Sequence, residues 1–257
     1  MIGGHGKCRK KLVSFTMIAI LILGVLAGCG KKAENTPTPG AQPTTPAPKA
    51  EEISGTVTAS GSSALLPLVK EAAKDFMDKN PKVTINVTAG GSGTGLKNVA
   101  DGTSDIGNSD VAAGDEYKDK GLVDHVAAIA PFALIVNKDV TIDNLTKQQA
   151  ADILTGKIKN WKEVNGKDAP IVIVHRAEGS GSRKLVQQIV LDNKEFTKEG
   201  VVQDSSGAMK TAVASTPGAI GYVDTPYVDD SLKALKFEGV AFSKDAIQTK
   251  KISSIWY

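Results

Sequence analysis

Glycine- and serine-rich segments stand three times between a strand pattern and a helix pattern in this chain of 257 residues. They are Ser60 to Ser63, Gly90 to Gly95 and Gly179 to Ser182. From Ile53 onward, extended runs alternate with stretches whose apolar residues recur every three or four positions. The alternation predicts an α/β fold with mostly parallel sheets, because a helix is the usual connection between parallel strands. In such sheets, ligands bind at the carboxyl ends of the strands, where all three segments fall.

The same periodicity predicts the individual elements. Strand patterns cover residues 56–59, 83–88, 105–110, 171–175 and 219–223. Helix patterns follow at residues 65–76, from 96 onward, at 146–154 and at 185–190. The apolar run from His125 to Val136 predicts one long buried strand. With 41% apolar residues, these elements can bury the core of one large domain or two modest ones.

The charge of the chain excludes one broad class of function. The formal net charge is +3, yet four basic residues between positions 7 and 11 precede residue 29, in a segment without any acid. The rest of the chain carries 27 basic and 28 acidic side chains, a net charge of −1. Nucleic-acid binding therefore lacks the basic surface that it requires. Two cysteines, Cys8 and Cys29, are too few for a disulfide framework or a four-cysteine zinc site.

The first 28 residues have the layout of a secretory signal peptide. A basic stretch precedes an apolar run from Leu12 to Ala27, which is shorter than the roughly 20 residues that span a bilayer. The run ends in Leu-Ala-Gly-Cys at Cys29, which resembles the lipobox of bacterial lipoproteins. We therefore expect residues 1–28 to be removed, Cys29 to carry lipid, including palmitate, and the protein to be anchored outside the cytoplasmic membrane. An uncleaved anchor with an incidental cysteine is the alternative.

A tether is expected from residue 29 to residue 52. Five of the eleven prolines fall between residues 30 and 52, among threonine, alanine and glutamine. This composition favours a semi-rigid, extended linker, because it offers almost nothing to bury. The linker would hold the folded part away from the lipid. A tail without a spacing role is the alternative.

The three glycine/serine segments are suited to binding an anion. A turn from a strand into a helix directs free backbone N–H groups, hydroxyls and the positive end of the helix dipole toward one point. Glycine at such a turn lets a ligand come within hydrogen-bonding distance of the backbone. Any single segment is better explained by helix capping, since serine and glycine are common at helix starts. Three of them in one α/β chain favour a shared oxyanion.

Arginine is rare in the chain after the signal segment, and its placement supports the same interpretation. Only Arg176 and Arg183 occur there, against 25 lysines. A guanidinium forms a planar fork that fits oxyanions, which an ammonium does not. Arg176 directly follows a predicted buried strand and is the candidate ligand, whereas Arg183 lies one helical turn further on and is expected to be solvated. Glu178 could hold the Arg176 guanidinium or could simply be an acid at a helix N-terminus.

The glycine, serine and histidine residues of the chain do not complete any of three common motifs of enzymes. Gly90 to Lys97 is not a P-loop, because Leu96 separates the last glycine from the lysine. Neither Ser92 nor Ser180 stands in a Gly-x-Ser-x-Gly elbow. His175 could orient a neighbour, but no serine triad is legible around it. We therefore expect no enzymatic activity, no metal and no cofactor.

Six segments in order resemble one protein family. They are GSSALLP (61–67), GSGTGLK (91–97), DIGNSD (105–110), LTGKIKNW (154–161), RAEGSGS (176–182) and TPGAIGYV (216–223). With them, the chain from about residue 53 to residue 257 resembles the extracytoplasmic phosphate-binding proteins of bacterial phosphate ABC transporters. The resemblance implies a two-lobed periplasmic-binding-protein fold of type II, with a hinge and a ligand cleft between the lobes. Residues 53–132 and 223–257 would form the first lobe, and residues 133–222 the second.

The resemblance also implies which residues contact phosphate. The matching positions are Ser63, Ala64, Ser92, Asp110, Arg176, Ser180, Gly181 and Ser182. Ser63 and Ala64 stand where the family often has Thr-Phe, so Ala64 can offer only its backbone N–H. Ser182 stands where threonine is common and keeps the hydroxyl. Glu178 takes the place of the acid that holds the family's arginine.

Asp110 matches the single acidic ligand of the family and implies a choice between anions. A carboxylate repels a bound oxyanion unless a proton lies between them, and near neutral pH phosphate keeps a proton whereas sulfate keeps none. A helix cap is the alternative role for Asp110.

By this resemblance, a lipid-anchored monomer would bind inorganic phosphate, would deliver it to ABC permease subunits and would bind no nucleic acid. The alternatives are a receptor for sulfate, molybdate or tungstate, a phosphoryl-transfer hydrolase that uses a loop serine, and a phosphate sensor or adhesin.

Overall fold

The computed structural model describes residues 52–129, 131–243 and 245–246. The predicted signal peptide, Cys29 and the tether up to residue 51 lie outside the described residues. Within the described ranges, no helix combines the length and the apolar character needed to cross a membrane.

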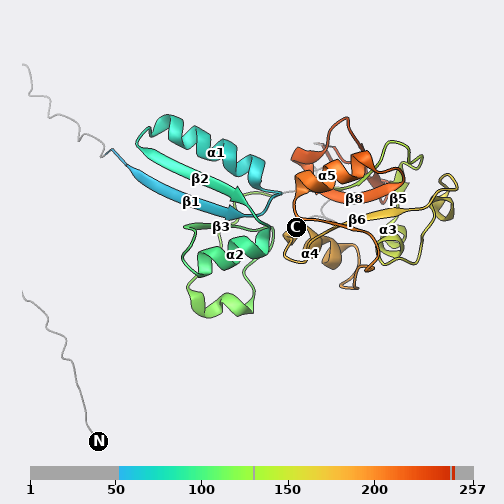
Figure 1. Cartoon of the computed structure of the whole chain (residues 1–257), viewed down its shortest axis with the longest axis horizontal. Coiled ribbons are helices and arrows are strands. Elements are labelled where there is room, and N and C mark those ends of the chain that lie inside the picture. Colours follow the sequence, from blue (N-terminus) through green and yellow to red (C-terminus); the bar gives the residue numbers. More distant parts are fainter. Residues whose placement is uncertain (1–51, 130, 244, 247–257) are drawn as a thin grey trace, which may run out of the picture. The chain divides into compact units, whose positions relative to one another are not determined.

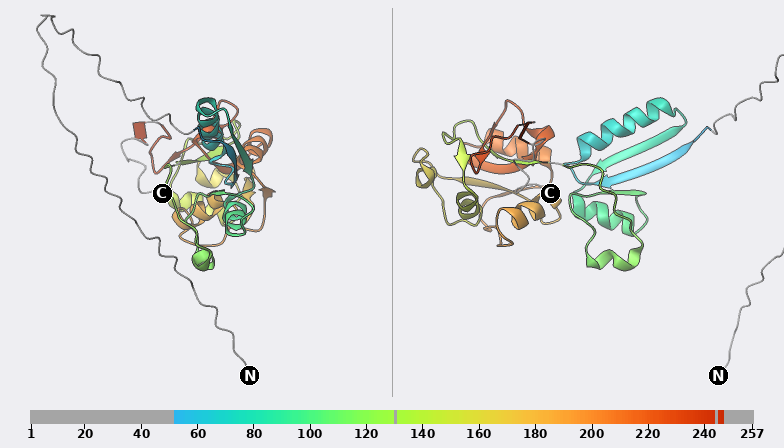
Figure 2. Two further views of the ribbon diagram at one scale, coloured as in Figure 1. Left: turned by 90° about the vertical axis from the view of Figure 1, so that its left-hand side faces the viewer. Right: turned by 180° about the vertical axis from the view of Figure 1, so that it is seen from behind.

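The first sheet has three parallel strands in the order β2-β1-β3 (Figure 1). Its elements are β1 (Gly55–Gly61), α1 (Leu66–Lys79), β2 (Val83–Ala89), α2 (Ser92–Ala100), β3 (Ile106–Asn108) and the 3₁₀ helix η1 (Asp115–Lys120). Helix α1 packs along β2, and α2 packs on β1 and β3 (Figure 2). The strands and helices predicted for this region are confirmed, but α2 begins at Ser92 rather than at Leu96. The glycine-rich segment therefore forms the first turn of this helix instead of a loop before it.

Gly95 determines how closely α2 approaches the first sheet. A Cβ atom at this position would lie 2.6 Å from the carbonyl oxygen of Asn108 and 2.7 Å from that of Ser60. Only glycine allows this approach. As a result, the start of α2 lies at the carboxyl ends of β1 and β3, which is where a ligand is expected.

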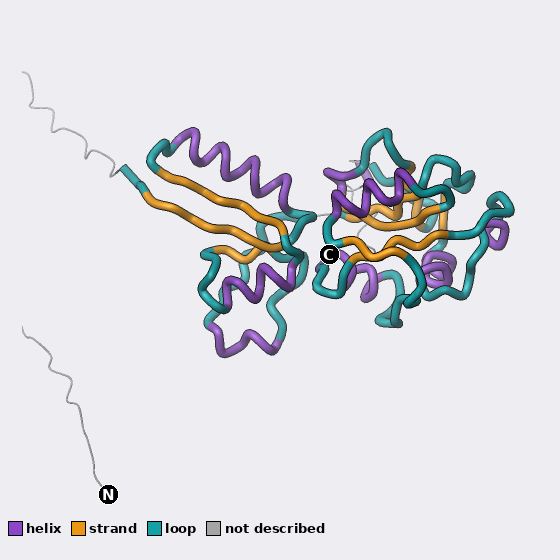
Figure 3. Tube along the Cα trace, in the orientation of Figure 1, coloured by secondary structure: helices purple, strands orange, loops and turns teal. Residues whose placement is uncertain are grey.

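The second sheet has five strands in the order β7-β6-β8-β4-β9, in which β6 is parallel to β7 and β8, and β4 is antiparallel to β8 and β9. Figure 3 shows the strands in orange and the helices in purple. Its strands are β4 (Phe132–Val136), β6 (Val172–Arg176), β7 (Val201–Gln203), β8 (Ala219–Asp224) and β9 (Lys233–Ala234). A separate parallel pair is formed by β5 (Asn144–Leu145) and β10 (Lys236–Phe237). The helices of this part are α3 (Lys147–Leu154), η2 (Trp161–Val164), α4 (Gly181–Ile189), α5 (Ser206–Ser215) and η3 (Thr225–Tyr227). The strands predicted near residues 171 and 219 and the helices predicted near 146 and 185 are confirmed.

The largest apolar core belongs to this second sheet. Ile135, Val136 and Ile220 are fully buried in it, and Trp161 packs into it while its indole N–H donates to the carbonyl oxygen of Gly218 at 3.0 Å. Such burial stabilises each strand by about 1.5–3 kcal/mol per large side chain. The carboxyl ends of β6 and β8 are held in place by this core.

The predicted strand from His125 to Val136 is wrong over its first half. Only Phe132–Val136 forms a strand, and Val126 is 93% exposed. The strand begins directly after Pro131, which has no N–H to donate to a neighbouring strand.

The described part of residues 223–257 lies with the second sheet, whereas the sequence placed it in the first lobe. β9 pairs with β4, β10 pairs with β5, and the N–H of Leu235 donates to the carbonyl oxygen of Leu134 at 2.9 Å. Leu232 and Leu235 bury their side chains in the core of that sheet. The apolar residues of this stretch thus pack in the core of the second sheet, close in sequence to the end of β8.

Candidate functional site

Asp110, in the loop after β3, contacts all three glycine/serine segments. Its backbone N–H donates to Ser92 Oγ at 3.0 Å. Its carboxylate accepts a hydrogen bond from the Ser62 hydroxyl and another, at 3.2 Å, from the Ser182 hydroxyl. The neighbouring helices α2 and η1 have other N-cap residues, so Asp110 caps neither of them. The three segments therefore meet at Asp110, two of them at its carboxylate and the third at its backbone N–H.

Arg176, the last residue of β6, supplies a buried positive charge. Its side chain is 2% exposed. Nη2 donates to Ser63 Oγ and to the carbonyl oxygen of Asp204, each at 3.0 Å, and Nη1 donates to Ser206 Oγ at 3.1 Å. Burial lowers the pKa of the guanidinium, and nearby acidic groups oppose that shift. An arginine in this position stays charged and attracts an anion.

Glu178 does not hold Arg176 in this structure. Its side chain is exposed, and within the described part of the chain it forms no ion pair with the guanidinium. The N–H of Ser180 donates to the carbonyl oxygen of Ala177 at 3.0 Å, and this turn carries Glu178 at the surface. The hydroxyl and carbonyl groups around Arg176 take the role that the sequence gave to Glu178.

Arg183 is not simply solvated, as the sequence suggested. Its guanidinium lies 4.2 Å from the centre of the Phe196 ring, and Nη1 donates to the carbonyl oxygen of Arg176 at 3.1 Å. The hydroxyl of Tyr222 accepts a hydrogen bond from the N–H of Arg176 at 3.2 Å. His175 packs edge-on against the same Phe196 ring. Arg183 and Tyr222 thus fix the backbone of Arg176 by hydrogen bonds, and the Phe196 ring packs against Arg183 and His175.

Two of the predicted ligands already form local hydrogen bonds. Ser180 is the N-cap of α4, and its Oγ accepts from the N–H of Arg183 at 3.2 Å. The N–H of Ala64 donates to Ser62 Oγ at 3.1 Å. The Ser180 oxygen therefore acts as a helix cap, and the hydroxyl hydrogen of Ser180 remains available for donation to a ligand.

The N-termini of α2 and α4 add partial positive charge at the same place. Ser92 is the first residue of α2, and Gly181 and Ser182 open α4. The N–H groups in the first turn of a helix have no carbonyl partner within that helix. Together with the helix dipoles, they favour a negatively charged ligand.

Sequence reasoning missed several residues of this site. Ser62 lies in the first segment beside the predicted Ser63, and Ser206 opens α5 directly after β7. The stretch from Asp204 to Gly207 reads Asp-Ser-Ser-Gly between a strand and a helix, so it is a fourth segment of the kind that the sequence analysis used. Asp224, buried at the end of β8, has no comparable signal in the sequence.

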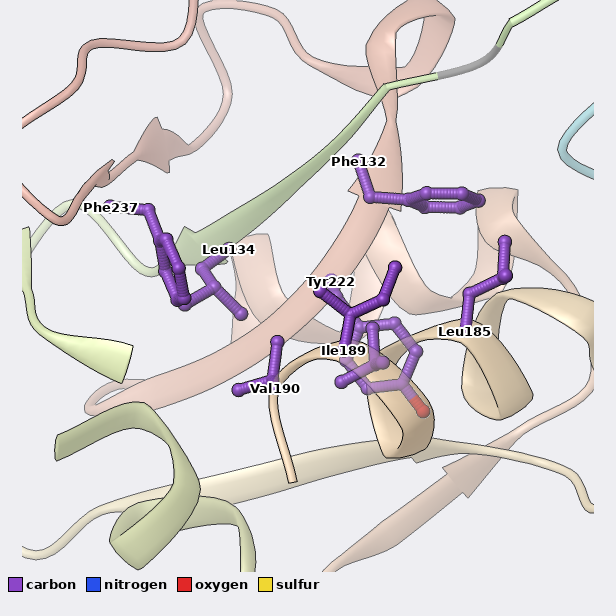
Figure 4. A pocket seen from close by; sticks show the side chains of 8 residues that line it. Phe132, Leu134, Leu185, Ile189, Val190, Tyr222 and Phe237 are labelled. Atoms are coloured by element: carbon purple, nitrogen blue, oxygen red, sulfur yellow. The ribbon is translucent and has the colours of Figure 1, made fainter. Parts of the chain in front are cut away.

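An apolar cavity lies beside the site but has different chemistry. Its walls include Phe132, Leu134, Leu185, Ile189, Val190 and Phe237 (Figure 4). The ring of Tyr222 also lines it, and the hydroxyl of that residue bonds the backbone of Arg176. The cavity offers no groups for an oxyanion. Among the described residues, no cluster of three or more histidine, cysteine, aspartate or glutamate side chains is placed to hold a metal.

Gly181 should be sensitive to substitution because the segments approach each other there. A Cβ atom at Gly181 would lie 2.3 Å from Ser92 Oγ and 2.8 Å from an Asp110 carboxylate oxygen. Overpacking of this kind costs about 1–3 kcal/mol. We therefore expect Gly181→Ala to weaken anion binding about tenfold or more, as measured by calorimetric titration.

Gly179 provides the matched control for this prediction. It lies in the same segment, and a Cβ atom there would meet no atom within 4 Å. Gly179→Ala should therefore keep the affinity within about twofold. Equal losses in the two variants would contradict the assigned contact between the segments.

The chain is similar to several known proteins in sequence and in fold. The model of the PBP superfamily domain matches residues 45–256. The phosphate-binding protein PstS of Bacillus subtilis is 43% identical over 237 residues, which cover 90% of this chain and 76% of the relative. A Clostridium perfringens protein described as a phosphate ABC transporter substrate-binding protein, solved with bound phosphate, has a TM-score of 0.73 and 39% identity over 77% of this chain and 82% of its own. An ABC-type phosphate transport receptor from Vibrio cholerae has a TM-score of 0.61 and 26% identity over 77% and 83%.

Proposed function

Because the chain belongs to the family of bacterial phosphate-binding proteins, we propose that it binds inorganic phosphate outside the cell and delivers it to the permease of a phosphate ABC transporter. The observation that carries this proposal is the joint placement of Asp110 and Arg176. One carboxylate and one buried guanidinium lie among serine hydroxyls and two helix N-termini. This set of groups suits an oxyanion that carries both negative charge and a proton.

The proposed ligands are the residues that the family resemblance implied. They are Ser63, Ala64, Ser92, Asp110, Arg176, Ser180, Gly181 and Ser182. Arg176 and the hydroxyl and N–H groups would donate to phosphate oxygens, and Asp110 would accept the proton that phosphate retains. For this, the Ala64 N–H and the Ser182 hydroxyl would exchange their present acceptors, Ser62 and Asp110, for the ligand. Ser62 would support Asp110, because its hydroxyl donates to that carboxylate. Ser206 would support Arg176, because its hydroxyl accepts from that guanidinium. Glu178 would have no part in holding the arginine.

Binding would be coupled to closure of two lobes about a hinge. Ser63 belongs to the segment after β1, and Arg176 ends β6, so the ligand would contact both sheets. A ligand shifts an open–closed equilibrium only by its difference in affinity for the two states. Contacts from both sheets provide that difference, because the open state would keep only one set of them. The protein itself would catalyse no reaction.

Delivery to a permease is tested by phosphate uptake. In cells that lack their own phosphate receptor but carry the permease of this transporter, the full-length chain should restore uptake of labelled phosphate. Binding without restored uptake would support the sensor or adhesin alternative. Hydrolysis of a chromogenic phosphate ester by the purified protein, lost in variants of the loop serines, would support the hydrolase alternative.

A lipid anchor at Cys29 is the second part of the proposal. The Cys29 thiol would be joined to lipid through a thioether, and removal of residues 1–28 would then leave Cys29 as the new N-terminus. We expect Cys29→Ser to lose incorporation of labelled palmitate and to leave the membrane fraction. Cys8→Ser is the matched control, because Cys8 lies within the proposed signal peptide and should be removed with it. Membrane retention and labelling of Cys29→Ser would contradict the anchor.

A further inference from the structure

Asp224 is a buried acid that the ligand set above does not use. It is the last residue of β8, stands opposite Phe132 of β4, and is 1% exposed. Its Oδ1 atom has no hydrogen-bond partner among the described residues. A buried carboxylate without a partner is costly, whereas the neutral acid is tolerated far better. The protonation state of Asp224 is therefore sensitive to nearby charge.

Asp224 lies at the same edge of the second sheet as the anion site, because it ends β8 and Arg176 ends the neighbouring parallel strand β6. Tyr227, which follows Asp224 in η3, donates its hydroxyl to the carbonyl oxygen of Ser63 at 2.7 Å. The charges of the anion site therefore act on Asp224.

Burial, with a smaller effect of the Asp110 carboxylate, raises the pKa of the Asp224 carboxyl to about 7, against the opposing effects of its own backbone N–H and of the Arg176 guanidinium. Among the other elements packed on β8, η3 supplies Tyr227, whose pKa is raised by burial and then by Asp224. Helix α5 supplies Lys210, which is paired with Asp229.

Strand β6 also carries His175, whose pKa is lowered by burial and whose ring packs against Phe196. β4 is entirely apolar, and Tyr222 of β8 is held neutral by burial, which raises its pKa. The Nε atom of Arg176 also lacks a partner among the described residues. The site thus combines one guanidinium with two carboxyl groups.

We propose that Asp224 is a second acidic residue of the anion site, which takes up a proton as the oxyanion binds and so makes the affinity fall with rising pH. The inference rests on the proposed function, since it assigns a proton to the same site. The buffer acid gives up the proton as its bond to hydrogen breaks, an O–H bond forms at the Asp224 carboxylate, and the conjugate base of the buffer remains in solution.

The direction of the effect follows from the charges. In the anion-free protein, Arg176 favours the ionised form of Asp224. A bound phosphate neutralises Arg176 and adds negative charge nearby, so the pKa of Asp224 rises further in the complex. Because the complex then holds more protons than the free protein, the affinity falls as pH rises above about 7, by up to about tenfold per pH unit.

Calorimetry in buffers of different ionisation enthalpy measures this proton uptake directly. At about pH 8, the full-length wild-type protein should take up more protons per phosphate than Asp224→Asn does, by as much as about one proton. The comparison removes the contribution of phosphate itself, which ionises in both experiments. Asp229→Asn is the control, because that exposed acid belongs to the Lys210 ion pair and should leave the wild-type uptake unchanged. Equal uptake by the wild type and Asp224→Asn would overturn the inference.

A measurement on the wild type covers the case in which Asp224→Asn does not fold. Carbon-13 NMR of the aspartate carboxyls should show that the titration midpoint of Asp224 moves to higher pH in saturating phosphate. An unchanged or lowered midpoint would overturn the inference and leave the proposed function intact. Failure of the wild type to bind phosphate would instead overturn the proposed function itself.

Discussion

Replacing Arg176 by methionine should weaken phosphate binding by about a hundredfold or more. The guanidinium is the only described arginine side chain that reaches the hydroxyls of the site, where it donates to Ser63 and Ser206. Loss of one partner from a buried, charged hydrogen-bonding pair costs about 2–5 kcal/mol, which corresponds to about 30-fold to several thousandfold in affinity. The dissociation constant for phosphate, obtained by titration calorimetry, measures the effect.

Two further variants distinguish the effect of the Arg176 contacts on phosphate affinity from the effect of positive charge alone. Lys184→Met removes a positive charge from the exposed face of α4 and should leave affinity nearly unchanged. Arg176→Lys keeps the charge but loses the planar fork, so it should still bind at least about tenfold more weakly than the wild type. If Lys184→Met weakened binding as much as Arg176→Met did, long-range charge rather than contact would explain the result. A thermal melt of each variant shows whether it is folded.

Replacing Asp110 by asparagine should narrow the preference for phosphate over sulfate by about a hundredfold. In the wild type, a carboxylate oxygen that faces an unprotonated sulfate oxygen would place two acceptors together, which costs a few kcal/mol. Asparagine can donate an N–H to that oxygen, so the penalty against sulfate disappears. Binding of phosphate should weaken at the same time, because the charge-assisted hydrogen bond to its proton is lost. Paired titrations with both anions give the ratio.

Asp105 provides the matched control for Asp110. It precedes the same strand, β3, and its carboxylate accepts hydrogen bonds from the N–H and hydroxyl of Thr58, each at 2.8 Å. Asp105→Asn removes the same charge at a distance from the meeting point of the segments. It should keep the selectivity of the wild type. Unchanged discrimination in Asp110→Asn would refute the selective role of that carboxylate.

Much of the fold could be predicted because its signals are local. The apolar periodicities located most strands and helices. The helix pattern at residues 65–76 corresponds to α1, which ends at Lys79 with Asn80 as its C-cap. The long strand that was predicted from His125 failed because composition alone cannot show where a neighbouring strand begins to pair. The stretch after β8 was assigned to the first lobe by the family resemblance alone. Its strands are only two residues long and are defined by the strands that they pair with, so no local pattern could correct that assignment.

The candidate site was predictable where backbone chemistry determines it. Turns from strands into helices collect N–H groups and hydroxyls, so Ser92 and Ser182 could be found from their positions. Whether Glu178 reaches Arg176 depends on the direction of one turn, which the sequence does not specify. Asp224 looks like an ordinary acid after a strand, and only the packing of β4, β6 and η3 around it makes it a buried one.

The central claim is that this site binds phosphate and rejects sulfate. Calorimetric titration of the purified, anion-free protein with phosphate, and then of a fresh sample with sulfate, tests it most directly. The structure predicts saturable one-to-one binding of phosphate and at least about a hundredfold weaker binding of sulfate. Equal binding of both anions would contradict the role of Asp110 and indicate a general oxyanion receptor. If neither anion bound, the serine segments would serve only to cap helices, and the proposed function would be contradicted.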